Sequence, residues 1–251
     1  MSPATDSAGV PFEGRSFLEN PGAGDDGSAP PRLLEALQRF RAREVGAADV
    51  VAALNGERLL IPLVAVRGDE GVGAHGRLVD KTQELSIVTV TGPDGRNVLP
   101  AFTSVEALRR WDAQARPIPI EAARVALAAA SDGTPLIVLD PASPTEFAVR
   151  APAFEALATG VAWLPCFEDE TVLDAFLTAG AGEEALLAIQ LAPGDPDARL
   201  AGPELLVQLS VRAGLEREEL DALLGRLQTA WAADLVIAAR VDSIGVTLDR
   251  V

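Results

Sequence analysis

Two residue types that often do chemistry occur once each in this chain of 251 residues, as His75 and Cys166. A histidine beside a cysteine can deprotonate the thiol, and the resulting thiolate is a strong nucleophile. Cys166, however, lies between Pro165 and Phe167, and an apolar setting of this kind is typical of a buried, inert thiol. We interpret His75 as a solvated loop residue. A hydrolase-like enzyme that uses this pair, or carboxylates, is kept as an alternative hypothesis.

The segment GVGAHG, residues 71–76, matches the Gly-x-Gly-x-x-Gly pattern of dinucleotide-binding loops. In such a loop the first glycine directly follows a strand, and a long helix starts after the third. Here four residues separate the apolar run ending at Val66 from Gly71, and two of them, Asp69 and Glu70, would repel phosphates. No helix-length apolar stripe follows Gly76. The sequence therefore predicts a connecting loop at this point.

The spacing that metal sites and serine nucleophiles require is also missing. One histidine without a second histidine or cysteine nearby does not match a zinc pattern. The acids at 168–170 precede an expected helix, where they complement the helix dipole. No Gly-x-Ser-x-Gly motif occurs. We therefore expect no catalytic residue, no cofactor and no metal.

Charge and composition restrict the classes of partner. The formal net charge is −16, and the part from residue 151 onward holds 17 acids against 6 arginines. Such a surface disfavours nucleic acid and anionic membranes. It fits a basic protein partner, and the alternative is that the acidity serves solubility alone. No apolar stretch reaches the ~20 residues of a membrane-spanning helix. Because the N-terminus does not resemble a secretory signal and there is one cysteine, we expect a cytoplasmic protein.

Residues 1–29, rich in Gly, Ser, Pro and Asp, are predicted to be a disordered tail. Apolar residues at helical spacing predict helices at 30–44, 47–56, 103–114, 121–133, 152–160, 169–180 and 216–234. Strand patterns occur at 58–66, 84–92, 97–102, 135–141, 185–194, 203–214, 235–242 and 244–249. A Pro-Asp-Gly-Arg turn at 93–96 joins two of them as a hairpin.

These elements predict an α+β fold. It consists of two small mixed α/β domains, residues 30–160 and 161–251, with partly antiparallel sheets flanked by helices. The segment at 216–234 has the clearest pattern, because Leu220, Leu223, Leu224, Leu227 and Trp231 form one apolar stripe.

Several segments together resemble the SseB family, the enhanced serine sensitivity proteins, and most closely its bacterial members from actinobacteria. They are VVAALNGERLLIPLVAV, VDKTQELSIVTVTGPDGRNVLPAFTSVEALRRW, ARPIPIEAARVALAAA and LIVLDPASP, which cover most of residues 47–147. The remainder resembles the C-terminal domain of the family more loosely. The resemblance implies a cytoplasmic α+β protein with no established catalytic activity or cofactor, and its name transfers no substrate.

The Phe102-Thr103-Ser104 block, Trp111 and Asp140-Pro141 carry this resemblance, and many relatives have Asn-Pro at the last position. We identify Phe102, Thr103, Trp111 and Asp140 as a candidate groove for a ligand or partner. The alternative is that Phe102 and Trp111 only fix a helix to the sheet, since apolar periodicity usually indicates core.

We therefore expect a non-catalytic protein-interaction or adaptor module that binds a protein partner, with homo-oligomers left open. A small-ligand sensor is the other alternative.

Overall fold

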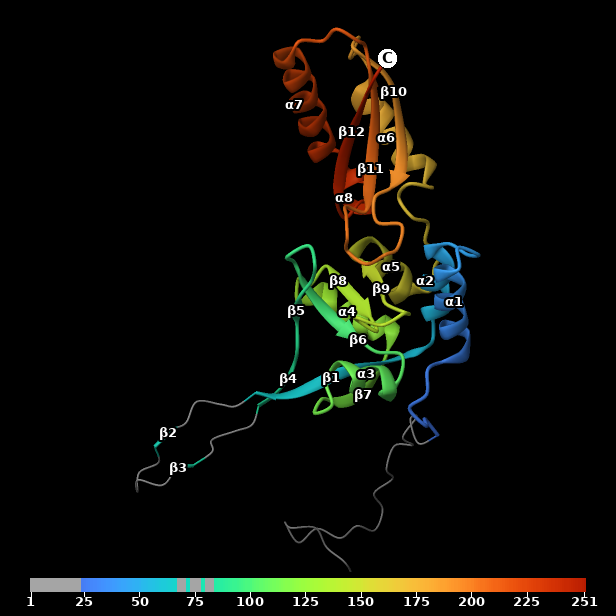
Figure 1. Cartoon of the computed structure of the whole chain (residues 1–251), viewed down its shortest axis with the longest axis vertical. Coiled ribbons are helices and arrows are strands. Elements are labelled where there is room, and N and C mark those ends of the chain that lie inside the picture. The colour runs from blue at the N-terminus through green and yellow to red at the C-terminus, as the bar shows by residue number, and fades with distance from the viewer. Residues whose placement is uncertain (1–23, 67–70, 73–77, 80–83) are drawn as a thin grey trace, which may run out of the picture.

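The computed structural model describes residues 24–66, 71–72, 78–79 and 84–251 (Figure 1). It confirms the predicted α+β class, with helices packed on mixed and antiparallel sheets. One hydrophobic core involves residues 33–157, and a second involves residues 166–237. No helix in the described part of the chain is long and apolar enough to cross a membrane.

The first domain contains two sheets. The antiparallel sheet β4-β1-β7 consists of Glu84–Ile87, Arg58–Val66 and Arg116–Glu121. The mixed sheet β5-β6-β8-β9 consists of Val90–Thr91, Asn97–Ala101, Leu136–Leu139 and Phe147–Arg150, with β6 and β8 parallel. Leu60 and Phe102 exchange backbone hydrogen bonds of 2.8 and 2.9 Å and so link the two sheets.

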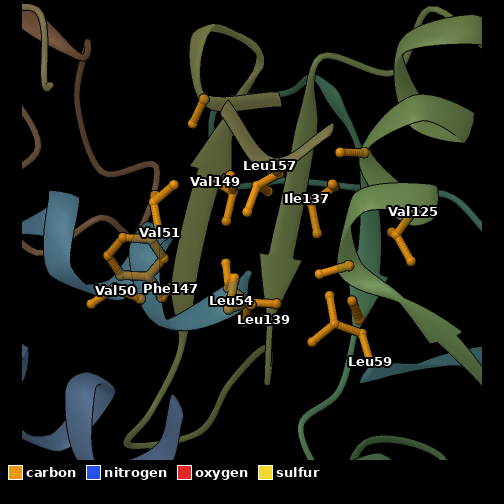
Figure 2. Close-up of a cluster of buried hydrophobic side chains, with 14 of the residues drawn as sticks. Val50, Val51, Leu54, Leu59, Val125, Ile137, Leu139, Phe147, Val149 and Leu157 are labelled. Atoms are coloured by element: carbon orange, nitrogen blue, oxygen red, sulfur yellow. The ribbon is translucent and has the colours of Figure 1, made fainter. Parts of the chain in front are cut away.

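Helices cover one face of the mixed sheet. They are α1 (Pro31–Arg41), α2 (Ala47–Leu54), α4 (Ala122–Ser131) and α5 (Phe154–Thr159), the last preceded by a 3-10 turn at Ala151–Ala153. Their apolar stripes pack on Ile137 and Leu139 of β8, as Figure 2 shows. The opposite face of β8 presents Leu136 and Val138, which pack against Leu200 from the second domain. β8 is therefore apolar on both faces because each face is covered.

The second domain is a three-stranded sheet with helices on one side (Figure 1). Its strands are β10 (Leu186–Pro193), β11 (Leu205–Val211) and β12 (Ile244–Arg250), and its helices are α6 (Glu170–Gly180), α7 (Arg217–Ala233) and α8 (Leu235–Arg240). Alternate residues of β11, including Val207 and Leu209, are buried against the helices, while Gln208 is exposed. The stripe predicted on α7 is confirmed at Leu220, Leu223, Leu227 and Trp231, which are buried.

Several predicted elements are wrong in type or extent. Residues 235–240 form α8 instead of a strand, because Asp234 caps their first turn by accepting from Val236 N and Ile237 N. The predicted strand at 84–92 is divided between β4 and β5, which belong to different sheets. β7 and β9 were not predicted.

Two predicted flexible segments are described only in part. Residues 1–23 of the expected tail lie outside the described residues, whereas residues 24–29 contact the first domain, where Val105 N–H donates to Gly27 O at 2.9 Å. Within the glycine-rich segment, β2 (Gly71–Val72) pairs with β3 (Leu78–Val79). Residues 73–77 between them, including His75, lie outside the described residues.

The first core predicts a contrast between two leucine truncations. Leu139 of β8 has no exposed surface, whereas Leu127 of α4 is 54% exposed. Leu139→Ala should lower the free energy of unfolding by about 2–5 kcal/mol through lost burial and the remaining cavity. Leu127→Ala should change it by only about 0.5 kcal/mol. Urea denaturation measures both, and equal losses would contradict this account of the core.

Candidate functional site

The two aromatic members of the predicted groove lie in the core of the first domain. Phe102 follows β6 and has no exposed surface, and its ring lies 5.3 Å from that of Trp111. Trp111 is half-buried at the end of α3 (Val105–Trp111) and packs on the cluster that contains Leu60, Phe102 and Leu108. This contact fixes α3 to the sheets, and the Phe102 ring faces no ligand surface.

The two polar members are hydrogen bonded to each other. Asp140 Oδ1 accepts from Thr103 N, and Asp140 Oδ2 accepts from Thr103 Oγ1, both at 2.8 Å. Thr145 Oγ1 donates to the same Oδ2 at 2.9 Å. Asp140 has a φ of 44°, in the left-handed region that Asp and Asn tolerate better than most residues. The carboxylate therefore joins the end of β6 to the turn after β8.

The helix α3 is capped by Ser104, one residue after the start predicted for it at residue 103. Thr103 and Glu106 have the spacing of a capping box, but Ser104 is the cap, since its hydroxyl accepts from Ala107 N at 3.1 Å. The Thr103 side chain is instead directed to Asp140.

Burial raises the pKa of Asp140, and the hydrogen bonds from Thr103 and Thr145 only partly offset this effect. The side chain is 1% exposed and already accepts three hydrogen bonds. A carboxylate in this situation organises the fold and has little capacity left for a substrate proton.

Thr103 and Asp140 lie on the wall of a hollow of about 830 Å³. The other walls are the first turns of α3, the turn at residues 143–145 and residues 26–29. Its polar lining includes the acids Asp26 and Glu106 as well as Ser28, Ser104, Arg109, Arg110 and Ser143, and Arg110 is paired with Glu106. The sequence predicted the Thr103–Asp140 wall and named Ser104 within the block that carries the family resemblance, but it assigned none of these lining residues to the groove.

Arg58 at the start of β1 connects this wall to residues 25–28. Its Nη1 donates to Thr103 O at 2.6 Å, while Nε and Nη2 donate to the two carboxylate oxygens of Asp25 at 2.5 and 2.7 Å. Nη2 also donates to Ser28 O at 2.6 Å. A guanidinium that holds a carboxylate through two parallel bonds is a specific recognition geometry. Sequence reasoning missed Arg58, because a single arginine at a strand start has no distinguishing pattern.

Cys166 does not have the environment of an activated nucleophile. It is 1% exposed, and burial, reinforced by the nearby carboxylate of Glu204, raises the pKa of its thiol. Its proposed partner His75 lies outside the described residues. In the parts of the chain that the structure describes, no three His, Cys, Asp or Glu side chains are grouped to hold a metal ion.

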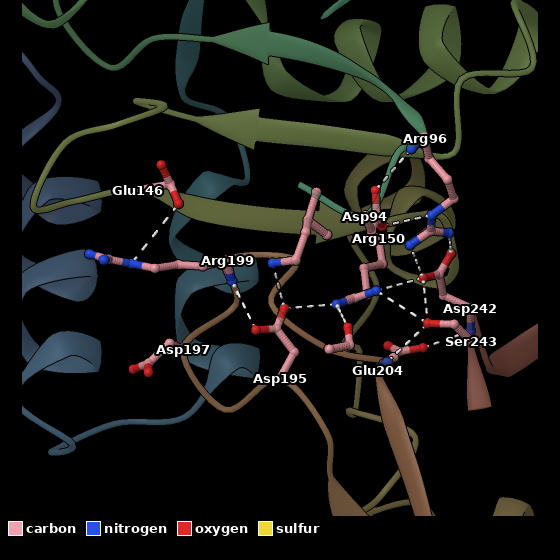
Figure 3. A network of polar contacts seen from close by, with 12 residues as sticks. Asp94, Arg96, Glu146, Arg150, Asp195, Asp197, Arg199, Glu204, Asp242 and Ser243 are labelled. Carbon is pink, nitrogen blue, oxygen red and sulfur yellow. Dashed lines mark hydrogen bonds and ion pairs between the residues drawn. The ribbon is translucent and has the colours of Figure 1, made fainter. Parts of the chain in front are cut away.

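A buried charge network lies where the two domains meet (Figure 3). Arg150 at the end of β9 donates to Asp242 Oδ2 at 2.7 Å and to Asp195 Oδ2 at 2.8 Å. The three side chains are at most 7% exposed. The Arg96 guanidinium donates to both carboxylate oxygens of Asp242, at 2.8 and 2.9 Å. Burial alone would raise the pKa of Asp242, but Arg96 and Arg150 together hold it below its ordinary value.

Residues 195–200 form a loop that crosses from the second domain to the first. Asp195 shapes it by accepting from Leu200 N at 2.8 Å, and Ala198 O accepts from Ala148 N of β9 at 2.7 Å. Arg41, the last residue of α1, and Arg43 just after it donate to Asp197 O and Pro196 O, both at 2.6 Å. Part of the acidity of the second half is thus paired with arginines of the first.

Comparison with known proteins identifies one family. The family model of the SseB protein N-terminal domain matches residues 33–156, which correspond closely to the first domain. Searches of the curated proteins and of the solved structures returned no match.

The network between the domains predicts a large difference between two arginine substitutions. Arg150→Met leaves Asp195 and Asp242 without their shared cation in a buried place, which should cost about 3–5 kcal/mol of unfolding free energy. Arg226 pairs with Glu183 on the surface, so Arg226→Met should leave the urea midpoint nearly unchanged. Comparable effects of the two substitutions would show that the Arg150 network does not stabilise the fold.

The raised pKa of Asp140 predicts how the free energy of unfolding changes with pH. Because its pKa is raised in the folded state, its contribution to stability is largest at low pH and is lost as the pH rises through the folded pKa. The unfolding free energy of the unaltered protein should therefore fall relative to that of Asp140→Asn above a pH of about 4. Asparagine tolerates the same backbone conformation, whereas Asp140→Ala loses three hydrogen bonds and should be less stable at every pH. Urea denaturation over a pH series gives all three curves, and a relative rise with pH would contradict the raised pKa.

Proposed function

The chain belongs to the SseB family through its first domain, and from this starting point we propose that it is a non-catalytic protein-interaction module of the cytoplasm. Its binding surface is the hollow beside α3, with Thr103 and Asp140 on one wall. The occupant is a segment of a partner protein, bound by the polar groups that converge there. The hollow carries this proposal.

The use of the reactive side chains supports a role in binding over one in catalysis. The carboxylate oxygens of Asp140 accept hydrogen bonds from Thr103 and Thr145. The Cys166 thiol is buried and its pKa is raised. Arg150 holds two carboxylates of the second domain. Each of these groups stabilises the fold, and none is directed at a shared reaction centre.

The hollow has features of a recognition surface. A volume of about 830 Å³ accommodates several side chains of a partner, and pockets of this size with a few convergent polar groups are typical of binding sites. Arg109 and Arg110 are exposed, whereas Thr103 and Asp140 are buried and fixed by their mutual bonds. The partner would thus meet exposed charged side chains above a buried polar wall.

The acids of the second half support a role other than the expected one, which was to bind a basic protein partner. Asp195, Asp197 and Asp242 are paired with arginines of the first domain, so these acids serve the contact between the domains. A partner that binds beside α3 meets the first domain, which supplies the arginines, and it need not be basic.

Selection of peptides tests the proposal without a known partner. Random peptides displayed on phage are selected on the immobilised full chain, and the Kd of each selected peptide is measured by fluorescence anisotropy. We expect Arg109→Glu, which reverses a charge in the hollow, to weaken binding by about tenfold. The matched control is Arg217→Glu, an equal charge change on α7 at a side chain that is 93% exposed. It should leave the Kd unchanged.

If no peptide is selected whose binding depends on Arg109, the proposed function is wrong. Selection of small molecules but no peptides in a parallel thermal-shift screen would favour a ligand sensor instead.

A further inference from the structure

Residues 24–29 separate two hollows of the first domain. On one side is the hollow beside α3, and on the other is a hollow of about 950 Å³ lined by Arg58, Pro119, Glu121 and Arg124. Asp26, Ser28 and Ala29 form part of the wall of both. Because these residues belong to both walls, the segment is the partition between the two hollows, and Arg58 lines the second of them.

The segment is held as a bound peptide would be held. Val105 N–H donates to Gly27 O, so a main-chain bond holds the segment at its bend. Arg58 grips the Asp25 carboxylate through two parallel bonds and also donates to Ser28 O. The side-chain bond from Arg58 lowers the pKa of Asp25, so the carboxylate is charged at neutral pH.

The surface prepares Arg58 for this contact. Thr103 O accepts from Nη1 of Arg58, which leaves the Nε and Nη2 edge to face the segment. Thr103 itself is fixed by Asp140. A continuous chain of hydrogen bonds therefore runs from Asp140 through Thr103 and Arg58 to the Asp25 carboxylate, and the Arg58 side chain is only 20% exposed with the segment in place. A part-buried arginine of this kind strongly favours a carboxylate partner.

The fit at residue 27 requires glycine. Gly27 has a φ of 79°, and a Cβ atom there would lie 2.7 Å from Cγ2 of Val105. Asp25 Oδ1 accepts from Gly27 N at 2.9 Å, which folds the aspartate back beside the glycine. The surface thus selects two features at once, an aspartate and a glycine two residues later.

We propose that the surface under residues 24–29 is a docking site for a short peptide of another protein that bends at a glycine two residues after an aspartate. The chain's own segment occupies this site until such a peptide displaces it. This inference rests on the proposed function, because the site forms one side of the hollow beside α3. It adds two points to the proposed function. The partner peptide carries the aspartate and the glycine, and residues 24–29 compete with it for the site.

The test releases the segment in the full chain and supplies it again as a separate peptide. Gly27→Val introduces both the strained φ and the collision with Val105. Gly24→Val is the matched control, since a Cβ at Gly24 meets nothing within 4 Å. The probe is a fluorescein-labelled synthetic peptide with the sequence of residues 23–31, and anisotropy gives its Kd.

We expect the Gly27→Val protein to bind the peptide about tenfold or more tightly than the Gly24→Val protein, in which the attached segment competes at a high effective concentration. A peptide with Asn in place of Asp25 should bind the Gly27→Val protein about tenfold more weakly, because it loses a charge-assisted fork. Asp25→Ala in the full chain is a second way to release the segment, and melting temperatures verify that each variant is folded.

If neither Gly27→Val nor Asp25→Ala binds the peptide better than Gly24→Val does, the inference is wrong. Should displayed peptides still bind in a manner that depends on Arg109, the proposed function survives and only the role of residues 24–29 falls. Sedimentation velocity covers the remaining case. A dimer of the unaltered chain that dissociates in Gly27→Val would mean that the segment is exchanged between copies, which overturns the partner named here.

Discussion

The buried guanidinium of Arg150 is the interaction on which the arrangement of the molecule depends. It binds Asp195 and Asp242, which come from two different segments of the second domain, and it starts from the last residue of β9 in the first. Asp195 also shapes the loop that carries Leu200 onto the outer face of β8. This ion pair therefore helps to hold the loop that covers one face of the first domain's mixed sheet. Burial makes the network strong, because a buried charge whose partner is removed is costly.

A second set of polar contacts organises the candidate binding surface. Asp140, Thr103 and Arg58 lie on three different elements, and their hydrogen bonds converge on the segment that contains Asp25. The two networks follow the same principle. In each, a charged side chain with little exposure is fixed by several partners, so its remaining donors or acceptors point in one defined direction.

The sequence predicted the regular elements where their periodicity was strong. The stripe on α7, the hairpin at 93–96 and the strand at β8 are examples, since one apolar face or a turn signal is sufficient there. The sequence-based prediction was wrong where residues outside the local pattern determine the secondary structure. The segment at 235–240 is apolar enough for a strand, yet Asp234 caps it as a helix, and β7 contains two prolines that conceal a strand pattern. The same holds for the candidate site. Phe102 and Trp111 were recognisable in the sequence as a pair, but they pack in the core.

The sequence by itself determined the α+β class, the family of the first domain and the absence of a recognisable catalytic motif, since these depend on composition, periodicity and local spacing. Only the tertiary structure decided which polar residues meet. Arg58 lies 33 residues from Asp25 and 45 from Thr103, and Arg150 lies 92 residues from Asp242. Contacts over such separations leave no local pattern, because they are created by the packing of strands and loops and not by neighbours along the chain.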